Sequence, residues 1–174
     1  MRQTKWVERR FELNLPVGVF PCVLERLRGT PARLEERVRG LPPGVLTART
    51  GEAWSIQEQA GHLLDLDELH EGRLEDYDRG LAVLRPADMN NRQTYEAGHN
   101  SARLEDLLAA FRAARARFVG RLEEMDEEAA ARTALHPRLR QPMRVIDFAF
   151  FVAEHDDHHL ASITELRRAL TESS

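Results

Sequence analysis

The sequence predicts an all-α protein, an antiparallel four-helix bundle with long connections between the second and third helices and between the third and fourth. Three observations lead to this prediction. Long segments are rich in Leu, Ala, Glu and Arg, which favour helix. Few stretches alternate apolar and polar residues with the period of a strand, and β-branched residues are sparse. The length of 174 residues fits one domain, residues 1–174, with a single sizeable core.

The first helical region covers roughly residues 18–40. Residues 29–31 read Gly-Thr-Pro and are expected to interrupt it, because Thr30 can cap a new turn with Pro31 at its first position. The Leu-Pro-Pro-Gly sequence at 41–44 ends the region.

The second helix begins at the sequence WSIQEQ. Ser55 and Glu58 have the spacing of a capping box, in which the two side chains satisfy backbone N–H groups that the first turn leaves unpaired. The helix is expected to run to about Arg79 and to stop at Gly80.

The third and fourth helices are predicted over about residues 101–124 and 144–170. The connections before them, 81–100 and 130–143, are long, and connections of this length in a compact domain are often functional. We therefore expect these two connections to cover one end of the bundle and to line a pocket. FELNL, at 11–15, is the only strand-like alternation and is too short to build a sheet.

Composition argues against several classes of partner. The net charge is −4, and the Arg residues are interleaved with Glu and Asp, as on solvated helix faces. Residues 1–15 lack the apolar run of a signal peptide, and no run approaches the ~20 residues that span a bilayer. The single cysteine, Cys22, excludes an intrachain disulfide and is expected to be a small core residue. We therefore expect a cytoplasmic protein with no nucleic-acid or membrane partner.

Three histidines lie close together in the sequence AEHDDHHLAS of the fourth helix. Each helical residue turns by about 100°, so His155 and His159 fall on the apolar face, one turn apart, while His158 falls outside it. Side chains spaced in this way lie about 5–6 Å apart and can reach one metal ion. A pair of hydrogen-bonded core histidines is an equally open interpretation, and His158 is expected to be solvated or to support a site indirectly.

A zinc-type catalytic site needs a third protein ligand and an open coordination position. Helical periodicity leans slightly towards His70 as this third ligand, but it does not exclude the other histidines outside the fourth helix. Asp65 and Glu58 lie one turn to either side of His62 and could orient a ligand or act as a base, although a capping or solvated role is commoner for such carboxylates. The candidates for the third ligand are the remaining histidines: His62, His70, His99 and His136.

Two segments carry a resemblance to a known family. WSIQEQAGHLLDLDELH, followed about ninety residues later by FFVAEHDDHHLASITELRR, resembles the DinB/YfiT-like superfamily, and the similarity extends from about Phe20 to Leu170. The resemblance implies a four-helix bundle that holds a divalent metal with three histidines, which by motif position are His62, His155 and His159. Zinc or nickel are the metals expected first, with iron or manganese as alternatives.

The resemblance also suggests what the protein does. The superfamily includes transferases that use low-molecular-weight thiols such as bacillithiol or mycothiol, a mycothiol-dependent isomerase, and proteins described as metal-dependent hydrolases. Its name reflects damage-inducible expression, that is, a stress response. The leading hypothesis is a thiol-dependent S-transferase that acts on electrophilic small molecules, with a low-molecular-weight thiol as cosubstrate. The alternatives are a hydrolase with metal-activated water and a non-catalytic metal-binding or sensor bundle.

Other side chains are candidates for the pocket lining or for a subunit contact. His99, Asn100 and His136 lie in the long connections and are candidates for the pocket lining. Family bundles sometimes dimerise, and Ile146 and Phe150 point away from the main apolar stripe of the last helix. They are equally compatible with a homodimer contact and with packing under a connection.

Overall fold

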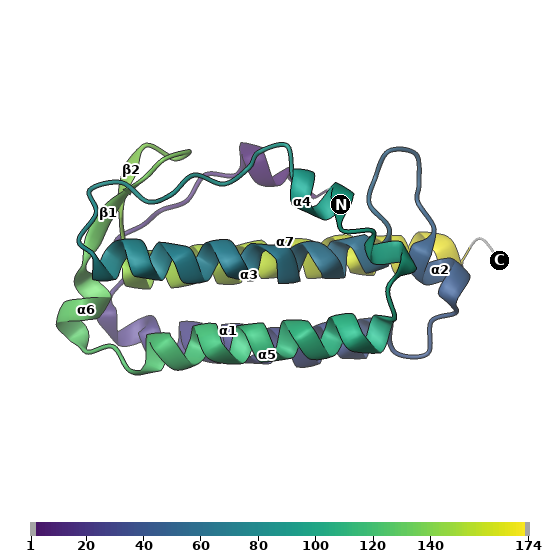
Figure 1. Cartoon of the computed structure of the whole chain (residues 1–174), viewed down its shortest axis with the longest axis horizontal. Helices are drawn as coiled ribbons and strands as arrows, with labels where there is room; N and C mark the ends of the chain where they lie inside the picture. The colour runs from purple at the N-terminus through teal and green to yellow at the C-terminus, as the bar shows by residue number, and fades with distance from the viewer. Residues whose placement is uncertain (1–2, 173–174) are drawn as a thin grey trace.

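Four long helices form a bundle in the computed structural model, which describes residues 3–172 (Figure 1). They are α1 (Phe20–Val38), α3 (Ile56–Asp78), α5 (Leu104–Glu123) and α7 (Val145–Thr171). The expected four-helix bundle is therefore confirmed. The shorter elements are η1 (Trp6–Glu8), η2 (Val17–Val19), α2 (Pro43–Thr47), α4 (Arg92–Glu96), η3 (His99–Ser101), α6 (Glu127–Ala131), β1 (Thr133–His136) and β2 (Gln141–Arg144).

The connections decide how the helices run. Figure 1 shows that α3 and α5 both start at the end of the bundle where α1 and α7 finish. The connection between α3 and α5 returns along the whole bundle, so α3 and α5 run parallel to each other. The contacting pairs α1–α5 and α3–α7 are antiparallel, whereas α1–α7 and α3–α5 are parallel.

Helix α1 is continuous, so the expected interruption at residues 29–31 is wrong. Thr30 and Pro31 both lie inside the helix and are buried. The Thr30 hydroxyl donates to a carboxylate oxygen of Asp156 on α7, at 2.7 Å. Packing against α7 therefore outweighs the local cost of a proline, which removes one hydrogen bond from the preceding turn.

The predicted ends of α3 are confirmed by its capping groups. Glu58 N donates to Ser55 Oγ at 3.1 Å, and Ser55 N donates to the Glu58 carboxylate at 2.9 Å. The helix ends at Asp78, and Gly80 follows with a φ of 64°, a left-handed conformation that glycine adopts without strain.

A two-stranded antiparallel hairpin, β1–β2, occupies the connection before α7 and was not expected from the sequence. Leu84 N donates to Leu135 O at 3.1 Å, which ties the hairpin to the connection after α3. The hairpin, this connection and the N-terminal segment all lie on the side of α3 and α7 that faces away from α1 and α5 (Figure 1). Residues 11–15 form no strand.

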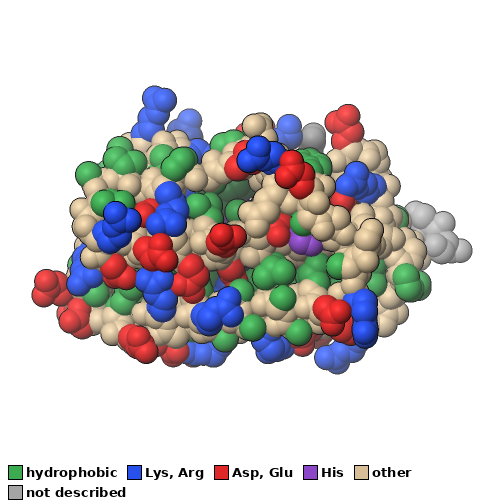
Figure 2. All heavy atoms as spheres, viewed as in Figure 1, with side chains coloured by type: hydrophobic (Ala, Val, Ile, Leu, Met, Phe, Trp, Pro, Cys, Tyr) green, Lys and Arg blue, Asp and Glu red, His purple; other side chains and the backbone are tan. Residues whose placement is uncertain are grey.

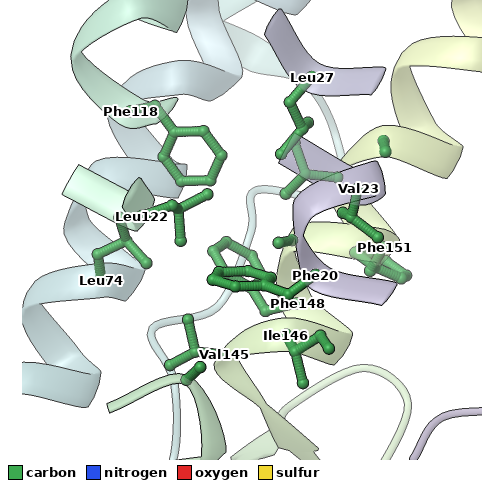
Figure 3. Close-up of a cluster of buried hydrophobic side chains, with 14 of the residues drawn as sticks. Phe20, Val23, Leu27, Leu74, Phe118, Leu122, Val145, Ile146, Phe148 and Phe151 are labelled. Carbon is green, nitrogen blue, oxygen red and sulfur yellow. The ribbon is translucent and has the colours of Figure 1, made fainter. Parts of the chain in front are cut away.

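A large hydrophobic cluster fills the end of the bundle next to the hairpin (Figure 3). Ile146 is fully buried in this cluster, so it packs in the core and offers no subunit contact. Phe150 is half-buried against the same cluster, under the Arg26 guanidinium. Cys22 is exposed, contrary to the expected core position, because it lies on the outward face of α1 beside the buried Val23.

A buried ionic network connects all four long helices. Arg115 on α5 is 1% exposed, and its guanidinium bonds Asp67 on α3 at 2.9 Å and both carboxylate oxygens of Asp156 on α7. The Thr30 hydroxyl on α1 completes the network. Burial raises the pKa of Asp67, but the Arg115 charge and the hydrogen bond from His70 outweigh it and hold that pKa below its usual value.

The visible face of the molecule (Figure 2) carries charged side chains of both signs. Figure 2 shows Lys and Arg side chains interspersed with Asp and Glu over one face of the molecule. Within residues 3–172, no helix combines the length and apolarity needed to cross a bilayer.

We expect Arg115→Met to lower the free energy of unfolding by about 3–5 kcal/mol, because it leaves two buried carboxylates without a counter-charge. Urea unfolding followed by circular dichroism measures this loss. Arg117→Met is the matched control, since Arg117 is exposed on the same helix and should change stability by less than about 0.5 kcal/mol. Equal effects of the two substitutions would contradict a stabilising role for the network.

Candidate metal centre

Three buried histidines converge between α3 and α7. His62 comes from α3, and His155 and His159 come from α7. One ring nitrogen of each lies within 4.8 Å of the other two, and the three side chains could hold one metal ion. We refer to these residues as the histidine triad. The structure therefore brings together the three residues that the family motif selects.

The spacing within the triad suits a shared cation. His155 Nε2 and His159 Nε2 are 3.0 Å apart. Two nitrogens bound to one tetrahedral zinc at ~2.0–2.1 Å would be about 3.3 Å apart. The same 3.0 Å spacing also fits a hydrogen bond between the two rings, and His155 Nδ1, on the other side of its ring, is buried and has no hydrogen-bond partner within residues 3–172. The donor set of three imidazoles also matches the ligands that zinc, nickel and iron accept.

A hydrogen-bond chain orients His62. The Thr94 hydroxyl donates its one proton to Asp65 Oδ2, at 2.8 Å. Thr94 Oγ1 is also 3.0 Å from His62 Nδ1, so it must accept the proton of that nitrogen. His62 Nε2 therefore carries the lone pair, as metal binding requires. Asp65 supports the ligand indirectly, which is one of the roles that the sequence suggested for it.

The close approach of His99 to α3 holds Asp65 in place. His99 Nε2 donates to Asp65 Oδ2 at 2.9 Å. A Cβ atom at Gly61 would lie 2.2 Å from the His99 ring, so only glycine at this position lets the ring reach the carboxylate. His99 therefore contributes to the site through Asp65 and does not line the cavity.

Gln59 orients the second ligand. Its side-chain oxygen lies 2.5 Å from His159 Nδ1 and accepts the proton of that nitrogen, which leaves the lone pair on Nε2. Sequence reasoning missed both Gln59 and Thr94. Gln59 lies three residues before His62 and so shares its helix face, which is a usable signal. Thr94 lies in the crossover connection, where no periodic pattern points to it.

The triad histidines are uncharged at neutral pH. Burial lowers the pKa of His62 to about 4. Burial, followed by the repulsion of neighbouring histidines, lowers the pKa of His155 and of His159 well below the usual value. Neutral imidazole is the form that binds a metal, so these ligands need not lose protons first.

The other candidates lie outside the triad. His70, towards which periodicity leaned, donates from Nδ1 to Asp67 at 3.2 Å and so belongs to the buried ionic network. His158 is half-buried and hydrogen-bonded to Gln3, as expected for a residue that is not a ligand. The Glu58 carboxylate caps α3 and pairs with Arg49, so it is no free base.

A cavity of about 490 Å³ opens beside the triad. The expectation that both long connections line it is confirmed by residues 86–89, Asn91 and residues 136–138. Trp6 and Val7, from the N-terminal segment, also line it and were not expected. Asn100 hydrogen-bonds Ser55 and lies away from the cavity, whereas His136 lines it.

Comparison with known proteins gives a family and two similar folds. The profile of the DinB superfamily matches residues 26–163. The structure is similar to that of YfiT from Bacillus subtilis, described as a probable metal-dependent hydrolase with an unusual four-helix bundle topology, with a TM-score of 0.79, 20% identity and 94% of both chains covered. It is also similar to a mycothiol-dependent maleylpyruvate isomerase, with a TM-score of 0.67 and 12% identity over 86% of this chain and 61% of that one. No curated protein matches the sequence.

We expect Gly61→Ala to weaken zinc or nickel binding about 10–100-fold, because the new methyl group displaces His99 and loosens the support of His62. Competition with a chromogenic chelator measures the affinity. Gly120→Ala is the control, since a Cβ atom there meets nothing within 4 Å and should add about 0.5–1 kcal/mol of stability without changing metal affinity. Unchanged metal affinity in Gly61→Ala would contradict this role of His99.

Metal binding should release almost no protons at pH 6. Three histidines with an ordinary pKa of about 6.5 would release about two protons at that pH, but the lowered values leave the triad already neutral. Calorimetric titration in buffers of different ionisation enthalpy counts the protons. Metal affinity should fall only as the pH approaches the His62 value of about 4. Release of two protons at pH 6 would show that the triad is solvated rather than desolvated.

Proposed function

The chain belongs to the DinB superfamily, and we propose that it is a metal-dependent enzyme that transfers a low-molecular-weight thiol to an electrophilic small molecule. His62, His155 and His159 would hold the metal, with zinc or nickel as the first candidates and iron or manganese as alternatives. When bound, such a metal lowers the pKa of a coordinated thiol and so supplies a nucleophile at neutral pH.

The observation that carries the proposal is the composition of the cavity wall. Apart from the triad, the wall is largely apolar and aromatic, and the described residues that line it include no Cys, Ser or Thr. The one lining carboxylate, Asp88, accepts hydrogen bonds from the backbone N–H groups of Asn90 and Arg92. The wall therefore offers no side-chain hydroxyl or thiol and no free carboxylate, while His70, His136 and His158 complete its titratable lining beside the arginines. This composition supports a nucleophile brought in by a second small molecule.

The residues around the triad orient the ligands and exclude water. The Trp54 ring lies 4.6 Å from the His62 ring, and the Trp6 ring lies 4.8 Å from the His155 ring. These indoles cover two sides of the triad. Thr94 and Gln59 hold the Nδ1 atoms of His62 and His159, so that Nε2 of each ring faces the triad. Because the three imidazoles are buried and held by fixed contacts, the site is preorganised, and a preorganised site strengthens electrostatic stabilisation of a developing anion.

Hydrolysis is the second candidate, because the fold is similar to that of the probable hydrolase from Bacillus subtilis. A metal-activated water would then attack the substrate, usually with a nearby acid or base. The lack of a free carboxylate beside the triad favours thiol transfer over this reaction, and the fold similarity to a mycothiol-dependent isomerase supports use of a thiol. A sensor with the same metal centre would bind a ligand without turnover.

The test combines metal analysis with a thiol panel. The metal-loaded protein is assayed with bacillithiol, mycothiol, glutathione and coenzyme A, each with an electrophilic acceptor, and thioether formation is followed by mass spectrometry. We expect turnover with at least one thiol, and its loss together with metal in His62→Ala and His159→Ala, because each removes one of three ligands. Thiol-independent cleavage of an ester or amide would favour the hydrolase. Ligand-induced stabilisation without turnover would favour the sensor. Failure of the wild-type protein to take up metal would overturn the metal centre.

A further inference from the structure

A second group of polar side chains lines the cavity on the side of the β1–β2 hairpin. Arg73, on α3, is 3% exposed, and the only hydrogen bond of its side chain within residues 3–172 runs from Nε to the Arg85 carbonyl, at 3.1 Å. Arg138 Nη2, in the hairpin turn, is buried, and so is His136 Nε2. Neither nitrogen has a hydrogen-bond partner among the residues that the structure describes. We refer to Arg73, His136 and Arg138 as the arginine subsite.

No carboxylate of the described chain neutralises the two arginines. Neither forms an ion pair with any residue between positions 3 and 172. Asp76 lies near Arg73, but both its oxygens bond Arg85. Asp88, which also lines the cavity, bonds backbone N–H groups. The subsite therefore carries an unbalanced positive charge.

His136 and Arg138 lie against the same aromatic ring, since the His136 ring is 5.1 Å and the Arg138 guanidinium 5.7 Å from the Phe151 ring. Burial first, and then the charges of Arg73 and Arg138, lower the pKa of His136 to about 3. Burial also lowers the pKa of Arg73 to about 10, which still leaves its guanidinium charged at neutral pH. Two cations and a neutral imidazole therefore face one side of the cavity.

Aromatic rings support the guanidinium groups without neutralising them. The Arg138 guanidinium lies 5.8 Å from the Trp6 ring and 5.7 Å from the Phe151 ring. The Arg73 guanidinium lies 5.9 Å from the Phe148 ring. Cation–π contacts are weaker than the cost of a buried charge that has no counter-ion. Arg73 is buried and Arg138 is half-buried, so an anion that enters the cavity would supply the counter-charge that the wall lacks.

We propose that the arginine subsite binds the carboxylate group of a small organic acid. Planar guanidinium groups match a carboxylate through paired N–H bonds, and His136 Nε2 is placed to join them. The Trp6 ring contacts both His155, at 4.8 Å, and Arg138, so one molecule in this 490 Å³ cavity reaches from the subsite to the triad. The acid is then one of the two reactants, anchored by its carboxylate with its reacting atom at the triad; only this role in catalysis rests on the proposed function.

Binding of 3-phenylpropanoate and of its neutral amide to metal-free protein tests the proposal by calorimetry. We expect the wild-type protein to bind the acid at least about tenfold more tightly than the amide, since only the acid forms charge-assisted hydrogen bonds. Arg138→Met should remove this preference. Arg140→Met removes a charge from the same hairpin turn, at an exposed position outside the cavity, and should retain it.

Two further variants make the result specific. Arg73→Lys keeps the charge but loses the planar fork, and should weaken acid binding while amide binding stays unchanged. His159→Ala should still bind the acid more tightly than the amide. This control distinguishes loss of the metal centre from loss of carboxylate binding at the arginine subsite. Equal binding of acid and amide by wild-type protein, no acid binding at millimolar concentration, or an unchanged preference in Arg138→Met would overturn the proposal.

Discussion

The ion pairs of Arg115 with Asp67 and Asp156 set the geometry on which the candidate site depends. Asp67 follows His62 by five residues on α3, and Asp156 is the neighbour of His155 on α7. By fixing these two carboxylates around one guanidinium, the network fixes how far α3 and α7 can slide past each other. Three imidazoles from two helices meet at one point only at a single such register.

The direction of the helices determines what covers the site. Because α3 and α5 are parallel, the chain between them must travel the length of the bundle, and it does so over the exposed face of α3 and α7. That path brings Thr94 to His62 and places His99 against Gly61. A simple up-and-down bundle needs no connection of this length. Here the long connection supplies the groups that orient His62 and one wall of the cavity.

Sequence reasoning succeeded where the signal is local and failed where it depends on the tertiary structure. The capping box at Ser55 and the one-turn spacing of His155 and His159 follow from helix geometry. The family motif, rather than periodicity, selected His62 over His70, because both residues lie on the inward side of α3 and only their depth along the bundle separates them. Continuity of α1 through Pro31 depends on α7 packing beside it, and the four-residue strands of the hairpin depend on pairing with each other. Neither interaction is encoded in a short window of sequence.

The two parts of the cavity wall have different structural origins. The imidazoles stand on rigid helices, whereas most of the groups facing them across the cavity come from the N-terminal segment, the crossover connection and the hairpin turn. Substitutions, insertions and deletions are tolerated in such segments far more readily than in packed helices. Divergent members of the superfamily can therefore keep the same buried histidines on the helices while the residues that face them across the cavity change.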